Sequence, residues 1–321
     1  MKQRCLFCLL PIEPDAGREY HPKCCQAFFG TTKVPELPYS SADLYELARQ
    51  VVRNKIAVTG VQPKLSLAFE KNVKEGIYRL TLVGLWGHFI LKPPSAVYPE
   101  LVENEYTTMR LAQVFGLPTA PFSYIRLQSG ELAYITRRMD RNQGKKLAME
   151  DLCQLSERLT EYKYRGAVEH TAKIIRRFSS NPGLDVLRFF EVVLFSYLTG
   201  NADMHLKNYS LLSHQDGNVL LAPAYDLVAT KLALPQDIEE SALTINGKKS
   251  KLKMSDFHAF AASAGLPAKA VENSIRYFSN NLNLALSEVS DSFLSADMKA
   301  AYQELLRNRW AIFKGIGTSK Q

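Results

Sequence analysis

Apolar residues recur at intervals of three and four along residues 184–198, the spacing of one face of an α-helix. The positions that share this face are Leu187, Phe190, Leu194, Tyr197 and Leu198. Gly200 follows shortly after, and glycine often ends a helix because it adopts the left-handed conformation without strain. The pattern therefore predicts a long helix over Leu184–Leu198.

The chain divides into a strand-rich half and a helical half. Short runs of Val, Ile, Leu and Phe between turn-forming residues predict strands at Lys55–Thr59, Lys64–Phe69, Ile77–Val83, His88–Lys92, Ser123–Leu127 and Leu132–Thr136. Helices are predicted at Ser40–Val52, Pro99–Phe115, Ser255–Ala264, Ala268–Phe278 and Ala296–Phe313. We therefore expect an α+β protein of two lobes, with a ligand bound between them.

The composition is that of a globular protein, with 46% hydrophobic and 22% charged residues. No apolar run approaches the ~20 residues of a membrane helix, and the start MKQRCLFCLLPIEPD lacks the cleavage site of a signal peptide. We expect a cytoplasmic protein without membrane contact. The net charge of +8 is consistent with a solvated surface and a few phosphate contacts, and nucleic-acid binding is the alternative.

Four of the five cysteines lie within the first 25 residues. Cys5-x-x-Cys8 is followed after twelve residues by His21-x-x-Cys24. Two ligand pairs, each closed over two residues, suit a tetrahedral zinc ion. We predict a structural zinc site. The alternative is a set of free thiols, with Cys25 competing with Cys24 as a ligand.

The loop after the long helix, GNADMHLKNYSLL, carries the candidate chemistry, and a predicted hairpin leads from it to Asp226. Asp203 and Asn208 have the D-x-x-x-x-N spacing of a kinase catalytic loop. Phosphoryl transfer needs a carboxylate to accept the proton of the attacking hydroxyl and oxygen ligands for Mg²⁺. We assign the base to Asp203 and the magnesium ligands to Asn208 and Asp226. The alternative is that Asp203 and Asn208 only cap turns.

Lys92 ends an apolar strand, from which it could contact the α- and β-phosphates of ATP. The next predicted helix carries Glu103 and Glu105. We expect Glu105 to pair with Lys92 because it lies on the apolar face of that helix; two solvated glutamates are the alternative. Within the catalytic loop, we expect Lys207 near the transferred phosphate and His205 holding the loop by hydrogen bonds.

Together these segments resemble the HipA family of bacterial toxin kinases, from about Lys55 to the C-terminus. The most specific segments are GVQPKLSL, FILKPP, ENEYTTMRLA, RRMDR, GNADMHLKNYSLL and APAYDLVAT. The resemblance implies a bilobal protein-kinase-like fold and the phosphorylation of serine or threonine in proteins with ATP and Mg²⁺. We expect a zinc-knuckle-like segment at residues 1–30, a strand-rich N-lobe at 31–138 and a helical C-lobe at 139–321.

The resemblance also implies the roles of individual residues. Asp203 is the base, and Asn208 and Asp226 bind magnesium. Lys92 and a loop hold the ATP phosphates, and the loop consists of Thr59, Gly60, Val61, Gln62, Pro63 and Lys64. The hinge beside adenine is Arg137, Arg138 and Met139. The remaining side chains at the nucleotide are His205, Lys207 and Tyr225.

For partners, the resemblance implies a toxin–antitoxin system. Known targets of the family include aminoacyl-tRNA synthetases, whose modification halts translation, and a small helix-turn-helix antitoxin usually accompanies the kinase, so that DNA is reached only through the antitoxin. Full-length members carry an extra N-terminal subdomain where this chain has the Cys/His segment. In this it resembles the shorter, HipT-like members, and a separate small protein could supply the missing subdomain.

Family members often carry an autophosphorylated serine in the strand that enters the ATP loop, and here Thr59 is the only hydroxyl in that stretch. We expect a phosphate on Thr59 to lower ATP affinity because it adds close to two negative charges; the alternative is a simple strand-end residue. A small-molecule or lipid kinase is the main alternative function. A degenerate kinase fold that binds nucleic acid would need a damaged active site, yet Lys92, Asp203, Asn208 and Asp226 are all present.

Overall fold

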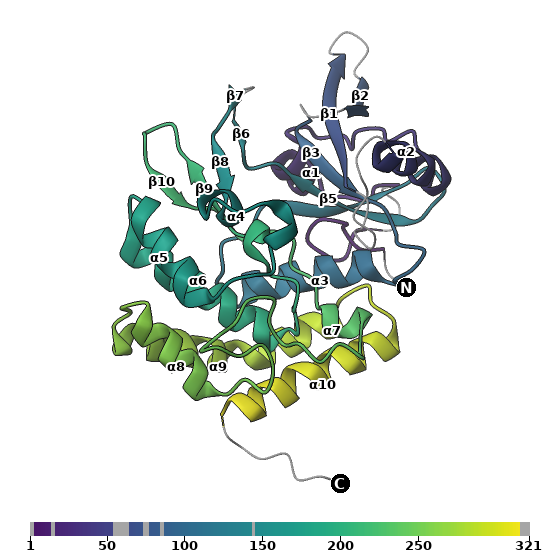
Figure 1. Cartoon of the computed structure of the whole chain (residues 1–321). Coiled ribbons are helices and arrows are strands. Elements are labelled where there is room, and N and C mark those ends of the chain that lie inside the picture. The colour runs from purple at the N-terminus through teal and green to yellow at the C-terminus, as the bar shows by residue number, and fades with distance from the viewer. Residues whose placement is uncertain are drawn as a thin grey trace. The chain divides into compact units, whose positions relative to one another are not determined.

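The computed structural model describes residues 3–13, 17–53, 64–72, 77–83, 87–142 and 145–314 (Figure 1). The chain forms two compact units. The first lies within Met1–Tyr106 and Ala120–Met139, and the second within Thr107–Thr119 and Asp140–Gln321. The predicted domain bounds at residues 30 and 138 stay a prediction.

The first unit contains a five-stranded antiparallel sheet in the order β2-β1-β3-β5-β4. The strands are β1 (Leu65–Asn72), β2 (Ile77–Val83), β3 (Phe89–Lys92), β4 (Phe122–Arg126) and β5 (Leu132–Arg137). All five were predicted from the alternation of apolar runs and turns, and only their ends differ. The predicted strand at Lys55–Thr59 lies outside the described residues.

Three helices contribute to this unit: α1 (Pro22–Phe29), α2 (Ser41–Arg53) and the first part of α3 (Leu101–Val114). The sequence predicted α2 and α3 but missed α1, which lies within the cysteine-rich segment. Proline at its first position and Gly30 at φ 75° mark its two ends. Phe28 and Phe29 of α1 pack against Phe89 of β3, with ring centroids 5.6 and 5.8 Å apart. The cysteine-rich segment is therefore part of the core of this unit.

The second unit is mainly helical. Its long helices are α5 (Val168–Phe178), α6 (Pro182–Leu198), α8 (Met254–Ser263), α9 (Ala268–Ser290) and α10 (Ala296–Phe313). In Figure 1, α9 and α10 run beside each other, and both pack against α6. α6 is apolar on nearly all sides, with Phe189, Phe190 and Phe195 fully buried. None of the helices in the described part of the chain is long and apolar enough to cross a membrane.

Short elements surround the loop that follows α6. One sheet has the order β10-β9-β8, formed by β8 (Met149–Asp151), β9 (Ser210–Ser213) and β10 (Val219–Leu221). A second small sheet pairs β6 (Arg141–Asn142) with β7 (Lys145–Lys146). The helices α4 (Leu152–Leu155) and α7 (Thr230–Ala233) have a single turn each. Two 3-10 turns complete the region, η2 (Thr160–Tyr162) and η3 (Leu206–Asn208).

Candidate active site

The loop after α6 is held in shape by its own backbone and side chains. Gly200 has φ 67°, and a Cβ at this position would lie 2.9 Å from side-chain atoms of Leu305 and Lys231. The Asn208 side chain donates through Nδ2 to the backbone oxygen of Asp203, at 3.0 Å. Asn201 accepts from the Asp203 backbone N–H at 3.1 Å. The structure thus ties together the two ends of the predicted D-x-x-x-x-N segment.

The Asp203 carboxylate is exposed and accepts a hydrogen bond from the hydroxyl of Tyr164, at 2.5 Å. Burial raises the pKa of Tyr164, and the hydrogen bond to Asp203 and the charges of Asp203 and Asp226 raise it further. Both carboxylates therefore lie near the same tyrosine. Sequence reasoning missed Tyr164, because it lies in an irregular segment far from the loop along the chain.

Asp226 follows the β9–β10 hairpin, as predicted. Its backbone has φ 60°, a conformation that is uncommon for any residue but glycine and that is found at functional sites. The preceding Tyr225 is fixed, because its hydroxyl contacts Ser210 Oγ at 2.6 Å and donates to the Lys207 backbone oxygen at 3.0 Å. Tyr225 therefore ties the segment that carries Asp226 to the loop after α6.

The donor set is consistent with magnesium. Because Nδ2 of Asn208 is used within the loop, Oδ1 remains as the acceptor of that amide. Together with the Asp226 carboxylate it offers oxygen ligands, which Mg²⁺ prefers. Asn208 keeps its hydrogen bond within the loop when Oδ1 binds a cation.

His205 and Lys207 lie on the same loop. His205 is buried, and its Nδ1 has no hydrogen-bond partner among the described residues, which leaves a polar atom available to a ligand. Burial lowers the pKa of His205, although the charge of Asp203 opposes this effect. Lys207 Nζ lies 2.7 Å from Asp151 Oδ2, so this cation is held by a carboxylate in the structure. Its predicted place beside the transferred phosphate stays a prediction.

In the first unit, Lys92 Nζ forms an ion pair with Glu105 Oε1 at 2.5 Å, and both side chains are buried. The prediction of Glu105 rather than Glu103 as the partner is confirmed. The proposed hinge begins at Arg137, the last residue of β5, and the Arg138 backbone N–H donates to the His88 oxygen at 2.8 Å. Of the proposed phosphate loop, Lys64 is described and exposed. The rest of that loop, Thr59–Pro63, lies outside the described residues.

The predicted zinc ligands come together. One atom from each of Cys5, Cys8, His21 and Cys24 lies within 4.8 Å of all the others. His21 Nε2 is 3.0 Å from the Pro11 backbone oxygen, a contact that orients the ring and leaves Nδ1 toward the sulfur atoms. Cys25, the alternative ligand, is buried and hydrogen-bonds Thr31 instead.

Thiol electrostatics in this cluster favour a bound cation. Burial raises the pKa of Cys8, and it raises the pKa of Cys24 to about 12. At Cys5, burial acts in the same direction, but hydrogen bonds from the Cys8 and His21 backbone outweigh it and lower the pKa. Burial thus disfavours the thiolate forms of Cys8 and Cys24, and a divalent ion would supply the charge that stabilises them.

The Cys/His segment is joined to the sheet by hydrogen bonds. The Leu6 backbone oxygen accepts from the Tyr124 N–H and from Ser123 Oγ, each at 3.1 Å. The Tyr20 hydroxyl donates to the Tyr124 oxygen, and Tyr106 of α3 donates to the Phe7 oxygen at 2.5 Å. These bonds connect the segment to β4 and to the helix that carries Glu105.

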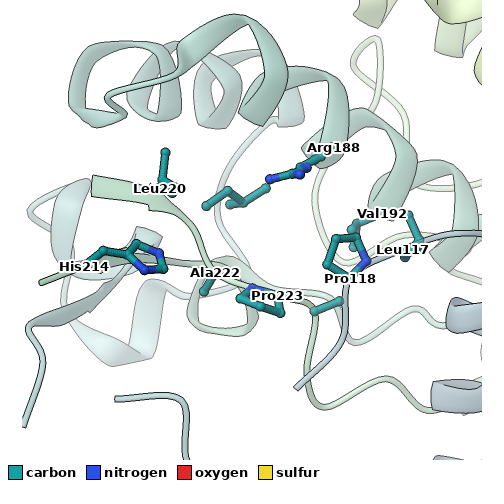
Figure 2. Close-up of a pocket in the computed structure, with 10 residues that line it drawn as sticks. Leu117, Pro118, Arg188, Val192, His214, Leu220, Ala222 and Pro223 are labelled. Carbon is teal, nitrogen blue, oxygen red and sulfur yellow. The ribbon is translucent and has the colours of Figure 1, made fainter. Parts of the chain in front are cut away.

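A pocket of about 180 Å³ lies in the second unit between α6, β10 and Leu117–Pro118 (Figure 2). Its walls are mostly apolar, and its charged or titratable side chains are Arg188 and His214. The residues that line it include none of the predicted site residues, but Ala222–Ala224 directly precede Tyr225.

The five-stranded sheet of the first unit and the helices of the second unit define an α+β protein with a protein-kinase-like fold. Residues 56–285 match the HipA-like C-terminal domain, and the chain belongs to this family. The family resemblance and the fold class predicted from the sequence are confirmed.

Relatives in this family carry kinase names. Y4mE of Sinorhizobium fredii, described as a candidate kinase, is 31% identical over 258 residues, which cover 75% of this chain and 60% of Y4mE. The serine/threonine-protein kinase toxin HipA of Shewanella oneidensis is 28% identical over 258 residues, 73% of this chain and 57% of the toxin. The chain therefore spans about three fifths of the length of these relatives.

Two solved structures share the fold. HipA of Shewanella oneidensis MR-1, in a complex with HipB and operator DNA, has a TM-score of 0.67 at 23% identity, covering 88% of this chain and 73% of that one. The Helicobacter pylori proinflammatory kinase CtkA has a TM-score of 0.54 at 16% identity, covering 74% of this chain and 89% of that one. At these identities the likeness supports the fold alone.

Proposed function

We propose that this chain is an ATP- and magnesium-dependent serine/threonine protein kinase with Asp203 as its catalytic base. The observation that carries the proposal is the conformation of the loop after α6. The Asp203 carboxylate is exposed, while the Asn208 amide fixes the Asp203 backbone. Membership of a family whose relatives carry kinase names supports it. The alternative, that these residues only cap turns, leaves the positive φ of Asp226 unexplained.

The roles follow from the chemistry of each group. Asp203 accepts the proton of the acceptor hydroxyl as that oxygen attacks. Asn208 Oδ1 and the Asp226 carboxylate hold Mg²⁺, and Lys92, oriented by Glu105, neutralises phosphate charge. Bound Mg²⁺-ATP supplies the phosphoryl group.

We further propose the nucleotide contacts that the family pattern implies. The Thr59–Lys64 loop covers the phosphates, the hinge Arg137–Met139 lies beside adenine, and His205 and Tyr225 line the site. The unpartnered Nδ1 of buried His205 supports this placement, because a ligand atom would satisfy it.

As a biological role, we propose the toxin of a toxin–antitoxin system in the cytoplasm. The acceptor would be a translation component such as an aminoacyl-tRNA synthetase. A small helix-turn-helix antitoxin would be the partner, and a separate small protein could supply the N-terminal subdomain. The Shewanella oneidensis relative named a kinase toxin supports this role, as does the solved HipA complex with HipB and operator DNA.

We also propose that Cys5, Cys8, His21 and Cys24 bind one structural zinc ion. A set of three sulfur atoms and one imidazole suits tetrahedral zinc, and the His21–Pro11 contact is the outer support typical of such sites. The segment is short and gains folding energy from a metal.

The test is phosphoryl transfer. Purified chain and its Asp203→Ala variant are incubated with radiolabelled ATP, Mg²⁺ and a bacterial lysate, and labelled proteins are hydrolysed to identify the phosphoamino acid. We expect phosphoserine or phosphothreonine with the wild type, and none with the variant or with chelator. Equal labelling by folded Asp203→Ala protein would overturn the proposal.

A further inference from the structure

Tyr164 places a hydroxyl group on the carboxylate that we propose as the catalytic base. Its Oη donates to Asp203 Oδ1 over 2.5 Å. Tyr164 is 41% exposed and Asp203 is exposed as well, so this bond lies where solvent reaches the base. An acceptor serine or threonine must present the same group, a hydroxyl that donates to this carboxylate, before transfer.

Ring contacts and a backbone hydrogen bond connect the segment of Tyr164 to the loop that carries Asp203. Its ring meets the His205 ring edge-on, with centroids 5.0 Å apart at 83°, and Lys163 Nζ lies 5.0 Å from its centroid. The Lys163 backbone oxygen accepts from the Leu206 N–H at 3.1 Å, which ties this segment to the catalytic loop. Since burial and the nearby carboxylates raise the pKa of Tyr164, its hydroxyl stays a donor at neutral pH.

We propose that Tyr164 is a gate for the acceptor: its hydroxyl occupies the hydrogen-bonding position on Asp203, and an acceptor hydroxyl must displace it. The proposal rests on the proposed kinase function. A single surface hydrogen bond is weak compared with the binding of a protein acceptor, so a docked acceptor displaces the tyrosine. A water molecule makes no further contacts that compensate for breaking the bond between Tyr164 and Asp203, so it displaces the tyrosine poorly. The gate would therefore suppress ATP hydrolysis without preventing transfer to protein.

A role of Tyr164 that supports Asp203 predicts the opposite effect of removing its hydroxyl. If Tyr164 instead orients the Asp203 carboxylate, its removal must slow every reaction that uses this base. The Tyr164→Phe variant separates the two, because it deletes the hydroxyl and keeps the ring against His205. The matched control is Tyr162→Phe, which deletes a hydroxyl two residues away, where the described contact of the ring is with Arg165.

The experiment measures ATP hydrolysis with Mg²⁺ and no protein acceptor. For Tyr164→Phe we expect a turnover about two- to tenfold above wild type, with the KM for ATP unchanged, because the hydroxyl contributes one exposed hydrogen bond. Tyr162→Phe should match the wild type. The rise should vanish in the double variant Tyr164→Phe with Asp203→Ala, because water then has no base.

Turnover in Tyr164→Phe that is equal to or below that of the wild type would overturn the gate, provided that its urea unfolding midpoint is preserved. A raised KM for ATP would overturn it too, since the effect would then act on the nucleotide. If Asp203→Ala also hydrolyses ATP and labels proteins like the wild type, the proposed function itself fails. If Asp203→Ala is inactive and only Tyr164→Phe fails to accelerate, the gate alone is wrong.

Discussion

Lys92 Nζ lies 2.5 Å from Glu105 Oε1, with side-chain exposures of 4% and 0%. Each of these buried charged groups is stabilised by the other, because both lose their hydration on folding. Lys92 Nζ also lies 5.3 Å from the centroid of the Tyr134 ring, which adds an aromatic face to its surroundings. The pair fixes a lysine on β3 against the helix α3.

Lys92→Met should destabilise the first unit strongly, because it leaves the Glu105 carboxylate buried without its cation. We expect the free energy of unfolding to fall by about 3–5 kcal/mol, the usual cost of removing one partner of a buried pair. Urea denaturation followed by circular dichroism measures it.

The control is the double variant Lys92→Met with Glu105→Leu, which should recover much of the loss because no charge remains buried. It should still fail to transfer phosphate, since the lysine is absent. A double variant that is no more stable than Lys92→Met would show that the ion pair is not the source of the effect.

Asp203 and Asp226 should lose different functions. Asp203→Asn should lower phosphoryl transfer by about 10²–10⁴-fold, the usual contribution of a general base, while Mg²⁺-dependent ATP binding persists. Asp226→Asn should lose transfer and also the magnesium dependence of ATP binding, because it removes a metal ligand. Titration with a fluorescent ATP analogue, with and without Mg²⁺, separates the two.

Asp216→Asn is the matched control, since Asp216 lies exposed in the β9–β10 turn and accepts from the Asn218 N–H at 3.0 Å. It should bind ATP and transfer phosphate like the wild type. If Asp226→Asn kept the magnesium dependence, the assignment of Asp226 as a ligand would be wrong.

Local patterns in the sequence predicted most of the elements. The strands β1–β5 follow from apolar runs between turns. The α9 helix continues past the predicted end at Phe278 because Ala285 and Val289 extend its buried face through a polar stretch. The α5 helix was missed, although its buried Val168, Ala172 and Ile175 have helical spacing and could have indicated it.

The residues of the candidate site also divide into those that the sequence predicted and those that it missed. Asp203, Asn208 and Asp226 lie close in sequence, so their spacing pointed to one site. Tyr164 approaches Asp203 from 39 positions away through an irregular segment, and no periodicity predicts such a contact. Glu105 was predicted as the partner of Lys92 because it lies on the apolar face of its helix, and the structure has this ion pair.

Cys8→Ser should weaken zinc binding strongly, because it leaves three protein ligands where a structural zinc site has four. We expect about one zinc per wild-type chain and much less in the variant by elemental analysis of protein purified without chelator. The first unit should also become easier to digest with protease at the Cys/His segment, because the metal supplies folding energy there.

Cys25→Ser is the control, since Cys25 hydrogen-bonds Thr31 and lies outside the cluster of four ligands. It should keep its zinc. Zinc loss in Cys25→Ser with retention in Cys24→Ser would instead favour the alternative ligand set. A metal-free wild type with a protease-resistant N-terminal segment would exclude a structural role for zinc.

His205 should make the protein sensitive to mild acid. Burial lowers its pKa in the folded state from the ordinary value of 6.5. Below pH 6.5 the unfolded chain therefore binds a proton that the folded chain does not, and the free energy of unfolding falls as the pH falls. Above that pH the residue contributes no pH dependence, and the loss stops growing once the pH is below the folded pKa. In this window the slope is at most about 1.4 kcal/mol per pH unit.

Urea unfolding of wild type and His205→Asn between pH 7.5 and pH 5 tests this prediction. The free energy of unfolding should fall further across this pH range in the wild type than in the variant. Each protein is compared only with its own value at pH 7.5. His258→Asn, at an exposed position on α8, should follow the wild-type pH dependence. Parallel curves for wild type and His205→Asn would mean that His205 titrates alike in the folded and unfolded states, and that burial does not control its charge.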